Sequence, residues 1–366
     1  MKPLRILHAE VATSFGGQEH RIYKEMLAMR ERGHHLELVC QPQAQLVGRL
    51  RDQGFTVHDM PMAGHVNFLK SVAKIRTILR RGRFDVLNTH SRRDTLIAGL
   101  AGRLAATPLI VRTRHLAIKP GSLLSYTWIP HRVTTVSDYV RNNLVKAGVR
   151  PDRVETIYSP VQAPPVVEHS SLRQELNLAP DDVVVGCVAV MRAKKGHRVL
   201  LEAIEPLIGQ YPNLHLVLVG SGSPTFEQVQ ARVAEKNLGG RVHLMGTRRD
   251  VPNLLAGFDL FALATEQEAS GTVFVEAAAA GLAVIGTDVG GVSEMLQNGV
   301  TGLLVPPRNP AALRDALKAL IDDPQRRREM GLAGQRQFQE EGKFSLDTLA
   351  AHTETCYGRW LKERRP

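Results

Sequence analysis

Two glutamates, Glu268 and Glu276, stand eight positions apart in the stretch TEQEASGTVFVEAAAAGLAVIGTDVGG. If Gly271 and Thr272 open a helix, Glu276 lies about one turn inside it and Glu268 lies on the preceding loop. The backbone N–H groups at a helix start favour an anionic ligand, whereas carboxylates accept hydrogen bonds from sugar hydroxyls. This combination suits a phosphate joined to a polyol, as in a nucleotide sugar. The alternative is an ordinary surface glutamate on a helix whose alanines pack against a neighbour.

A short basic segment offers groups that could bind the phosphates of such a ligand. Arg192 and Lys195 occur in MRAKKGH, directly after the apolar run VVVGCVAV. Arginine presents a planar fork of donors and lysine a compact charge, and both suit phosphate oxygens at the end of a strand. The segment therefore predicts a pyrophosphate contact, with a solvent-exposed basic turn as the alternative.

Histidines and glycines occupy comparable places in the first half of the chain. His90 and His115 each follow a short apolar run, and parallel strands bind ligands at their carboxyl ends. Gly16 and Gly17 precede an expected helix, where the missing Cβ lets a ligand approach the backbone. The alternatives are a simple glycine turn and, for His115, a loop histidine bound to the backbone.

Apolar runs of strand length alternate with helical segments along the whole chain, which predicts an α/β fold with parallel sheets. A proline-rich stretch, YSPVQAPPVV, separates two such series and predicts an inter-domain linker. The chain of 366 residues is long for one domain and sufficient for two. We expect Rossmann-like domains at residues 1–160 and 161–346, followed by a terminal helix within 347–366. Among the expected elements are strands at 3–9, 35–40, 84–89, 109–113, 133–137, 154–157, 183–190, 214–219, 242–245 and 255–264, helices at 64–83, 95–105, 138–147, 197–208 and 347–365, and a mobile loop at 117–130.

Composition narrows the class of protein. Three well-separated cysteines, Cys40, Cys187 and Cys356, form no metal-ligand spacing and predict free thiols in a reducing cytosol. The N-terminal apolar run is too short for a signal peptide, and no run is long enough to span a membrane. We therefore expect a cytoplasmic protein. Aromatic residues make up only 5% of the chain and no nucleic-acid motif occurs, so a nucleic-acid partner is not expected.

The positive charge lies in the first half. Residues 1–160 hold 25 Lys and Arg against 12 Asp and Glu, whereas the remainder holds 22 against 24. The expected helix at 64–83 places Lys70, Lys74 and Arg81 on one face, and predicts that Leu69, Val72, Ile75 and Leu79 point inward. Basic side chains of this kind predict an anionic partner, and we expect peripheral adhesion to an anionic membrane surface.

The spacing of Glu268 and Glu276, followed by AAAAGLAVIGTDVGG, resembles the C-terminal signature of retaining glycosyltransferases of family 4, which have the GT-B fold. The resemblance extends over nearly the whole chain and includes FDVLNTHS, TTVSDYVRNNL and the segment from Val242 to Thr247. It implies two Rossmann-like domains facing across a cleft, with the terminal helix crossing back to the first domain. It also implies transfer of a sugar from a nucleotide-sugar donor to a glycan or lipid-linked acceptor, with retention and usually without a metal.

The resemblance implies roles for particular residues. His90 would lie near the donor sugar, Arg192 and Lys195 at the pyrophosphate, Glu268 at the sugar and Glu276 at the ribose. Further donor contacts would come from Gly16, Gly17, Gly220, Gly222, Gly246, Thr247, Ala269, Ser270, Gly271, Thr272 and Val273. Arg114 and His115 would lie on the acceptor side.

Two departures from the family pattern and one absence matter. Val190 stands where many relatives have an arginine, so Arg192 is expected to replace it. Ala269 and Ser270 stand where glycine and a large residue are common, which leaves the donor sugar and base undefined. No Asp-x-Asp occurs, so no cofactor or metal cage is expected. The setting implied is envelope polysaccharide, lipopolysaccharide or glycolipid synthesis; the alternatives are a GT-B nucleotide-sugar 2-epimerase and a non-catalytic nucleotide-sugar binding protein.

Overall fold

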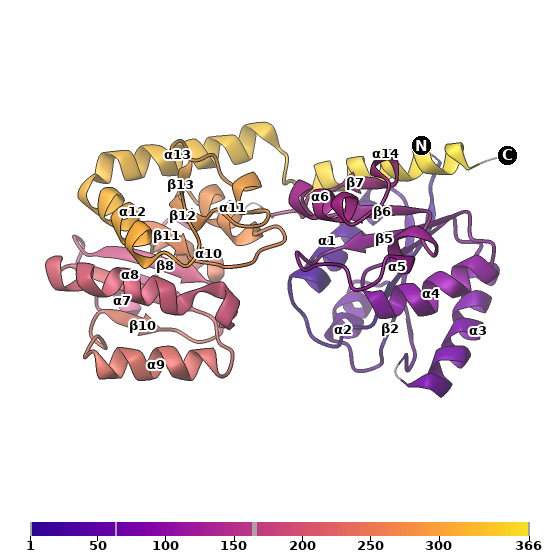
Figure 1. Ribbon diagram of the computed structural model, residues 1–366, viewed down its shortest axis with the longest axis horizontal. Helices are drawn as coiled ribbons and strands as arrows, with labels where there is room; N and C mark the ends of the chain where they lie inside the picture. The colour runs from indigo at the N-terminus through magenta and orange to yellow at the C-terminus, as the bar shows by residue number, and fades with distance from the viewer. Residues whose placement is uncertain (1, 63, 163–166, 365–366) are drawn as a thin grey trace. The chain divides into compact units, whose positions relative to one another are not determined.

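A computed structural model describes residues 2–62, 64–162 and 167–364 of the chain. It consists of two compact units (Figure 1). Unit 1 comprises Met1–Pro160 and Lys343–Pro366, and unit 2 comprises Val161–Gly342. Residues 163–166 of the expected linker lie outside the described residues. Each unit is a parallel sheet with helices, so the predicted α/β class with two Rossmann-like domains is confirmed.

The sheet of unit 1 has seven parallel strands in the order β3-β2-β1-β4-β5-β6-β7. Both of its faces are covered, since neighbouring residues of the central strands, such as Ile6 and Leu7 of β1, belong to two different buried apolar clusters. The strands are β1 Arg5–Glu10, β2 His35–Cys40, β3 Thr56–Asp59, β4 Val86–Thr89, β5 Leu109–Arg114, β6 Arg132–Thr135 and β7 Val154–Thr156. The helices are α1 Gly17–Glu31, α2 Gln45–Asp52, α3 His65–Gly82, α4 Arg92–Leu104, α5 Leu124–Thr127, α6 Asp138–Lys146, η1 Pro151–Arg153 and α14 Leu346–Glu363.

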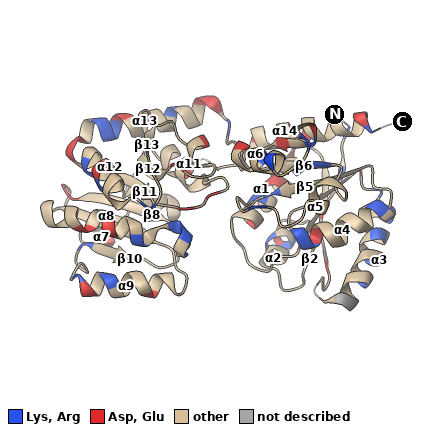
Figure 2. Ribbon diagram, viewed as in Figure 1, with Lys and Arg blue, Asp and Glu red and all other residues tan. Residues whose placement is uncertain are grey.

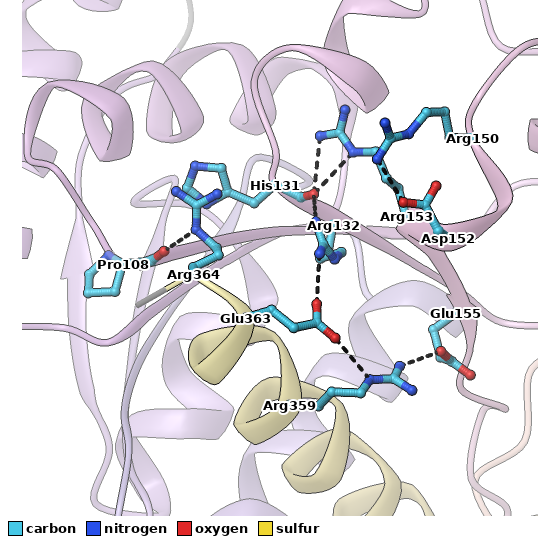
Figure 3. Close-up of polar contacts among 10 residues, drawn as sticks. All are labelled: Pro108, His131, Arg132, Arg150, Asp152, Arg153, Glu155, Arg359, Glu363 and Arg364. Atoms are coloured by element: carbon cyan, nitrogen blue, oxygen red, sulfur yellow. Dashed lines mark hydrogen bonds and ion pairs between the residues drawn. The ribbon is translucent and has the colours of Figure 1, made fainter. Parts of the chain in front are cut away.

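The terminal helix α14 packs on unit 1 through a buried aromatic face. Trp360 and Tyr357 are at most 2% exposed, and the amide of Asn88 donates a 3.0 Å hydrogen bond to the Tyr357 hydroxyl. Ion pairs surround this face, and Figure 3 shows two of them: Arg359 lies 2.7 Å from Glu155, and Glu363 lies 2.8 Å from Arg132. These contacts make α14 part of unit 1.

The sheet of unit 2 has six parallel strands in the order β10-β9-β8-β11-β12-β13. The strands are β8 Val183–Val188, β9 Leu214–Val219, β10 Val242–Leu244, β11 Leu260–Leu263, β12 Ala283–Thr287 and β13 Gly302–Val305. The helices are α7 Leu172–Glu175, η2 Ala193–Lys195, α8 His197–Gln210, α9 Thr225–Glu235, α10 Val251–Ala256, α11 Thr272–Ala279, η3 Val292–Glu294, α12 Pro310–Asp322 and α13 Pro324–Glu341.

Three local predictions were wrong. The expected strand at 255–264 is shorter, because Leu255 and Ala256 belong to helix α10 and the strand begins at Leu260; a short apolar run does not distinguish helix from strand. Leu69 does not point inward on α3 but is 71% exposed, whereas Val72, Ile75 and Leu79 are buried. The expected loop at 117–130 contains the short helix α5.

Among the described residues, no helix has the length and apolar character needed to cross a bilayer.

Candidate functional site

The sheet of unit 2 reverses its strand order between β8 and β11. From β8 the chain proceeds outward through β9 to β10, and from β11 it proceeds the other way through β12 to β13. In open α/β sheets, ligands bind beyond the carboxyl ends of the strands at such a reversal. The segment with Arg192 and Lys195 follows β8, and the segment with Glu268 follows β11. The topology thus places the two predicted contact segments side by side.

The two segments are joined by side chains and by backbone. The Lys195 ammonium forms an ion pair with the Glu268 carboxylate, and both side chains are largely buried, at 27% and 15% exposure. The neighbouring Lys194 donates a 2.6 Å hydrogen bond to the Gln267 side chain, and its carbonyl accepts one of 2.7 Å from the backbone N–H of Glu266. Lys195 and Glu268 therefore meet, as their expected roles in one donor site require.

Glycines permit these close approaches of backbone to backbone. Gly196 has a φ of +70°, and a Cβ there would lie 1.9 Å from the carbonyl oxygen of Ala264. Gly290 has a φ of +59°, and a Cβ there would lie 1.9 Å from the carbonyl oxygen of Glu268. The next residue, Gly291, donates a 3.1 Å hydrogen bond to that same oxygen. The paired glycine at the end of the signature therefore fixes the loop that carries Glu268.

Helix α11 begins as predicted. Gly271 is its N-cap with a φ of +87°, and Thr272 is its first residue. Glu276 is its fifth residue and is half-buried, while Ser270 is buried at the end of the preceding loop. The N–H groups of the first helical turn, including those of Thr272 and Val273, have no partners within the helix. An anionic or hydroxyl-bearing ligand can accept hydrogen bonds from them.

The three loops that follow β8, β9 and β10 contact one another along the same edge of the sheet. Gly220 donates a 2.7 Å hydrogen bond to the carbonyl of Gly246, and the hydroxyls of Ser221 and Thr247 lie 3.1 Å apart. Gly222 lies against the Met191 carbonyl, where a Cβ would come within 2.3 Å. Arg192 is exposed beside these loops, as is Val190 at 54%. The predicted donor residues after these strands thus form one edge, and their contacts with a ligand stay predictions.

Unit 1 reverses its strand order between β1 and β4, and histidines lie at that point. Nδ1 of His8, on β1, lies 3.0 Å from Nε2 of His90, which follows β4. Nδ1 of His90 lies 3.1 Å from Nε2 of His115, which follows β5. Burial lowers the pKa of all three, that of His8 to about 3, and the charge of Arg21 lowers each further. The predicted His90 and His115 therefore meet in a line of neutral imidazoles that also includes His8.

The glycine pair lies beside a buried carboxyl group. Gly16 is the N-cap of α1 and donates a 2.7 Å hydrogen bond to Glu19, while Gly17 is the first helical residue. A Cβ on Gly17 would meet nothing within 4 Å, so open space adjoins the backbone there. Nearby, Gln18 donates to the Glu10 carboxyl, whose pKa burial raises to about 7. This arrangement leaves room for a ligand at the start of α1.

Some residues of this edge were missed in the sequence. His8, Glu10 and Glu19 are at most 5% exposed, although their side chains are polar. In the sequence, His8 and Glu10 could have been recognised as site candidates because they are polar residues at alternate positions near the end of an otherwise apolar strand. Arg114, by contrast, was predicted on the acceptor side, and its guanidinium donates to the carbonyls of Leu116 and Ile118 at 2.9 and 2.6 Å and to Tyr126 at 2.7 Å. Its role toward an acceptor stays a prediction.

Potential metal ligands gather elsewhere. Among the described residues, one set of three side chains has potential ligand atoms that all lie within 4.8 Å of one another: Glu155, His352 and Cys356. Glu155 already pairs with Arg359, and burial raises the pKa of the Cys356 thiol to about 12. None of the predicted site residues belongs to this set.

Comparisons with known proteins identify the family. Residues 169–337 match the profile of the family described as Glycosyl transferases group 1, and residues 15–163 match that of Glycosyltransferase Family 4. The chain belongs to the family 4 glycosyltransferases. This glycosyltransferase is 23% identical to the UDP-Gal:alpha-D-GlcNAc-diphosphoundecaprenol alpha-1,3-galactosyltransferase of Escherichia coli, over 87% of this chain and 88% of that protein.

Solved structures share its fold, and they confirm the predicted GT-B class. A glycosyltransferase from Rickettsia africae ESF-5 aligns with a TM-score of 0.91 and 22% identity, covering 99% of this chain and 100% of that one. Anabaena Alr3699/HepE in complex with UDP aligns with a TM-score of 0.87 and 21% identity, covering 97% of this chain and 100% of that one. The family matches favour neither the 2-epimerase nor the non-catalytic binding protein considered from the sequence.

Proposed function

We propose that this glycosyltransferase transfers a sugar from a nucleotide-sugar donor to a hydroxyl of a glycan or lipid-linked acceptor, with retention and without a metal ion. The observation that carries the proposal is the Lys195–Glu268 pair at the reversal of the unit 2 sheet, next to the start of α11. The Lys195 cation and the N–H groups at the start of α11 suit the diphosphate of such a donor, and the carboxylates of Glu268 and Glu276 suit its sugar hydroxyls and its ribose.

The chemistry required is stabilisation of a departing diphosphate. Lys195 and the exposed Arg192 supply positive charge, and the first turn of α11 supplies N–H groups. Glu268 holds the Lys195 ammonium and accepts from a sugar hydroxyl, and Glu276 accepts from the ribose. Removing one such preorganised donor typically slows a reaction about 10²- to 10³-fold. Because these groups neutralise the leaving group themselves, the mechanism needs no divalent cation.

The named relatives support the substrate classes. The Escherichia coli protein is named for a UDP-galactose donor and a diphosphoundecaprenol-linked acceptor, and the Anabaena structure contains UDP. We therefore infer a nucleoside diphosphate sugar as donor and an envelope glycan or glycolipid precursor as acceptor. We infer that the reaction takes place in the cytoplasm, at the inner face of its membrane, because the three buried cysteines, Cys40, Cys187 and Cys356, are free thiols.

We also propose that unit 1 docks on an anionic membrane surface. Figure 2 shows lysine and arginine along α3, on which Leu69, Lys70 and Lys74 are exposed. Arg76 on this helix donates a 3.1 Å hydrogen bond to the carbonyl of Leu104, whose side chain is 52% exposed. Arg103 next to it donates 2.6 Å to the carbonyl of Trp128, which is 63% exposed. Exposed apolar side chains among arginines and lysines are typical of membrane-surface contacts.

The membrane proposal is tested by co-sedimentation with vesicles of phosphatidylglycerol or of phosphatidylcholine. At about 1 kcal/mol for each basic residue, replacing Lys70 and Lys74 with alanine weakens binding to the anionic vesicles about 30-fold. Equal binding of the wild-type protein to both kinds of vesicle would contradict the proposal.

The catalytic proposal is tested with a panel of UDP-, GDP- and ADP-sugars. The donor stabilises the folded protein by mass action and raises its melting temperature. With that donor and acceptor, the protein releases nucleoside diphosphate, and the product keeps the anomeric configuration of the donor when read by proton NMR. Glu276→Ala should melt as the wild type does but lose the donor-induced stabilisation and turnover. Normal turnover in this variant, or an inverted product, would contradict the proposal.

A further inference from the structure

A thiol, an imidazole and a carboxylate come together between the last strand of the unit 1 sheet and the terminal helix. Glu155 lies on β7, at the end of the strand order, and His352 and Cys356 lie on α14. One ligand atom from each of the three lies within 4.8 Å of the other two, and Nε2 of His352 lies 3.9 Å from Oε1 of Glu155. Each of these groups is a common ligand of zinc.

The helix explains why His352 and Cys356 meet. Residues four positions apart lie one above the other on the same face of an α-helix. The expected absence of a metal-ligand spacing therefore does not hold for Cys356, whose third neighbour, Glu155, comes from a strand distant in the sequence. The helix is also a firm support, because Cys356, Tyr357 and Trp360 belong to a buried apolar cluster of unit 1.

Arg359 holds the carboxylate of Glu155 by one oxygen. Its guanidinium lies 2.7 Å from Oε2 of Glu155 and 4.0 Å from Glu363, as Figure 3 shows, whereas Oε1 of Glu155 is the oxygen near His352. Carboxylates that bind metals are commonly hydrogen-bonded in addition, which fixes their orientation. The charges also balance, since a thiolate and Glu155 offset the two charges of a zinc ion, and Glu363 offsets Arg359.

The three side chains differ in exposure, which gives an ion a way in. Cys356 is a free thiol and only 2% exposed, whereas the side chains of His352 and Glu155 are 41% and 35% exposed. Zinc bonds of about 2.0–2.3 Å in tetrahedral geometry place neighbouring ligand atoms about 3.3–3.7 Å apart. Small rotations of the two half-exposed side chains close the remaining distance, and a water can take the fourth position.

We propose that Glu155, His352 and Cys356 bind a zinc ion that fastens α14 to β7. Thiolate and imidazole ligands favour zinc, whereas Mg²⁺ and Ca²⁺ prefer oxygen ligands. On binding, the Cys356 thiol gives its proton to solvent and coordinates as a thiolate. The ion stabilises folded unit 1 by mass action, because the three ligands come together only in the folded protein. It takes no part in sugar transfer, since none of the predicted donor or acceptor residues belongs to the set.

The first test counts the ions and identifies their ligands. Protein without a histidine tag, stripped with a chelator and titrated with ZnCl₂ against a competing chromophoric chelator, should bind one equivalent with a Kd below about 1 μM. His352→Asn and Cys356→Ala should each weaken this binding at least about 10²-fold. His35→Asn is the matched control, because His35 is 45% exposed and also contacts a glutamate, Glu37.

The second test detects the thiolate directly. Co²⁺ in place of zinc should give a thiolate charge-transfer band in the near ultraviolet and visible absorption typical of tetrahedral coordination. Both should be lost in Cys356→Ala and kept in Cys187→Ala, where the replaced thiol is equally buried but belongs to unit 2. Zinc should also raise the melting temperature of the wild type by a few degrees and leave that of His352→Asn unchanged.

The outcomes separate this site from folding defects and from the proposed function. Zinc binding that is unchanged in His352→Asn, or lost in His35→Asn, would overturn the site, as would no binding at about 10 μM zinc. Because the His352 side chain is half-exposed, its replacement keeps the buried face of α14 and decides the matter even if Cys356→Ala does not fold. Well below the melting temperature, sugar transfer should proceed equally with and without zinc. Loss of transfer on removal of the ion would contradict its structural role.

Discussion

Replacing Gly290 with alanine tests how the site loop is held. The residue has a φ of +59°, and its Cβ would lie 1.9 Å from the carbonyl oxygen of Glu268. An ordinary contact begins at 3.4 Å, so the two backbones must separate by about 1.5 Å. Because the opposing atom is a backbone oxygen, no side-chain rotation can relieve the contact. The loop carrying Glu268 must move.

The expected effect has two parts. An alanine in the left-handed region costs about 1–2 kcal/mol, and overpacking adds about 1–3 kcal/mol to the loss of unfolding free energy. A displacement of about 1 Å at a catalytic group can slow a reaction about 10²-fold. We expect Gly290→Ala to lose stability and also to lose about 10²-fold in the rate of nucleoside diphosphate release.

Gly299→Ala is the matched control. Gly299 also has a positive φ, of +80°, but a Cβ there would meet nothing within 4 Å. Its replacement should therefore lower the free energy of unfolding only by the cost of placing alanine in the left-handed region. The rate of nucleoside diphosphate release should stay within a few-fold of that of the wild type. Urea denaturation and a coupled assay of nucleoside diphosphate release provide the two readings. Equal rates in the two variants would refute the conclusion that Gly290 fixes the Glu268 loop.

Three further outcomes are expected. Burial lowers the pKa of His8 to about 3, so as the pH falls below about 6.5 this residue takes up a proton in the unfolded chain before it does so in the folded protein. Between pH 7.5 and 5.5 this difference should lower the free energy of unfolding by about 1.4 kcal/mol. If the unfolding free energy of His8→Asn depended on pH as that of the wild type does, this expectation would be contradicted. Tyr357→Phe, which removes the hydroxyl that accepts a hydrogen bond from the buried Asn88 amide, should cost about 1–3 kcal/mol in urea denaturation, against less than about 1 kcal/mol for Tyr158→Phe, whose hydroxyl makes a solvent-exposed hydrogen bond to Asp138. EDTA should leave the transfer rate unchanged, and a strict requirement for added Mg²⁺ or Mn²⁺ would argue against a metal-free mechanism.

The part of the site with local sequence signals was predictable. Gly271 stands where a left-handed N-cap is needed, so the start of α11 and the depth of Glu276 within it followed from spacing alone. The alternation of strands and helices likewise predicted the fold class. The meeting of Lys195 with Glu268 followed only as an implication of the family resemblance, because 73 residues separate them and strand order decides their distance.

The missed features depend on strand order and on packing. The contact between His8 and His90 joins residues 82 positions apart and exists because β1 lies next to β4. No periodicity in the sequence indicates that β1 and β4 are neighbours in the sheet. Leu69 fits the apolar stripe of α3 by spacing, yet it is 71% exposed. The last two residues of helix α10, Leu255 and Ala256, were predicted as part of the following strand, because a short apolar run does not distinguish helix from strand.

The most direct test compares two adjacent lysines in the transfer reaction. Lys195 pairs with Glu268, whereas Lys194 is exposed and bonds to Gln267. With the donor and acceptor identified, Lys195→Ala should slow transfer at least about 10²-fold and leave the melting temperature of the free protein near that of wild type. Lys194→Ala should stay within a few-fold of wild type. If the two variants transferred sugar at similar rates, the assignment of the donor diphosphate to Lys195 would be wrong.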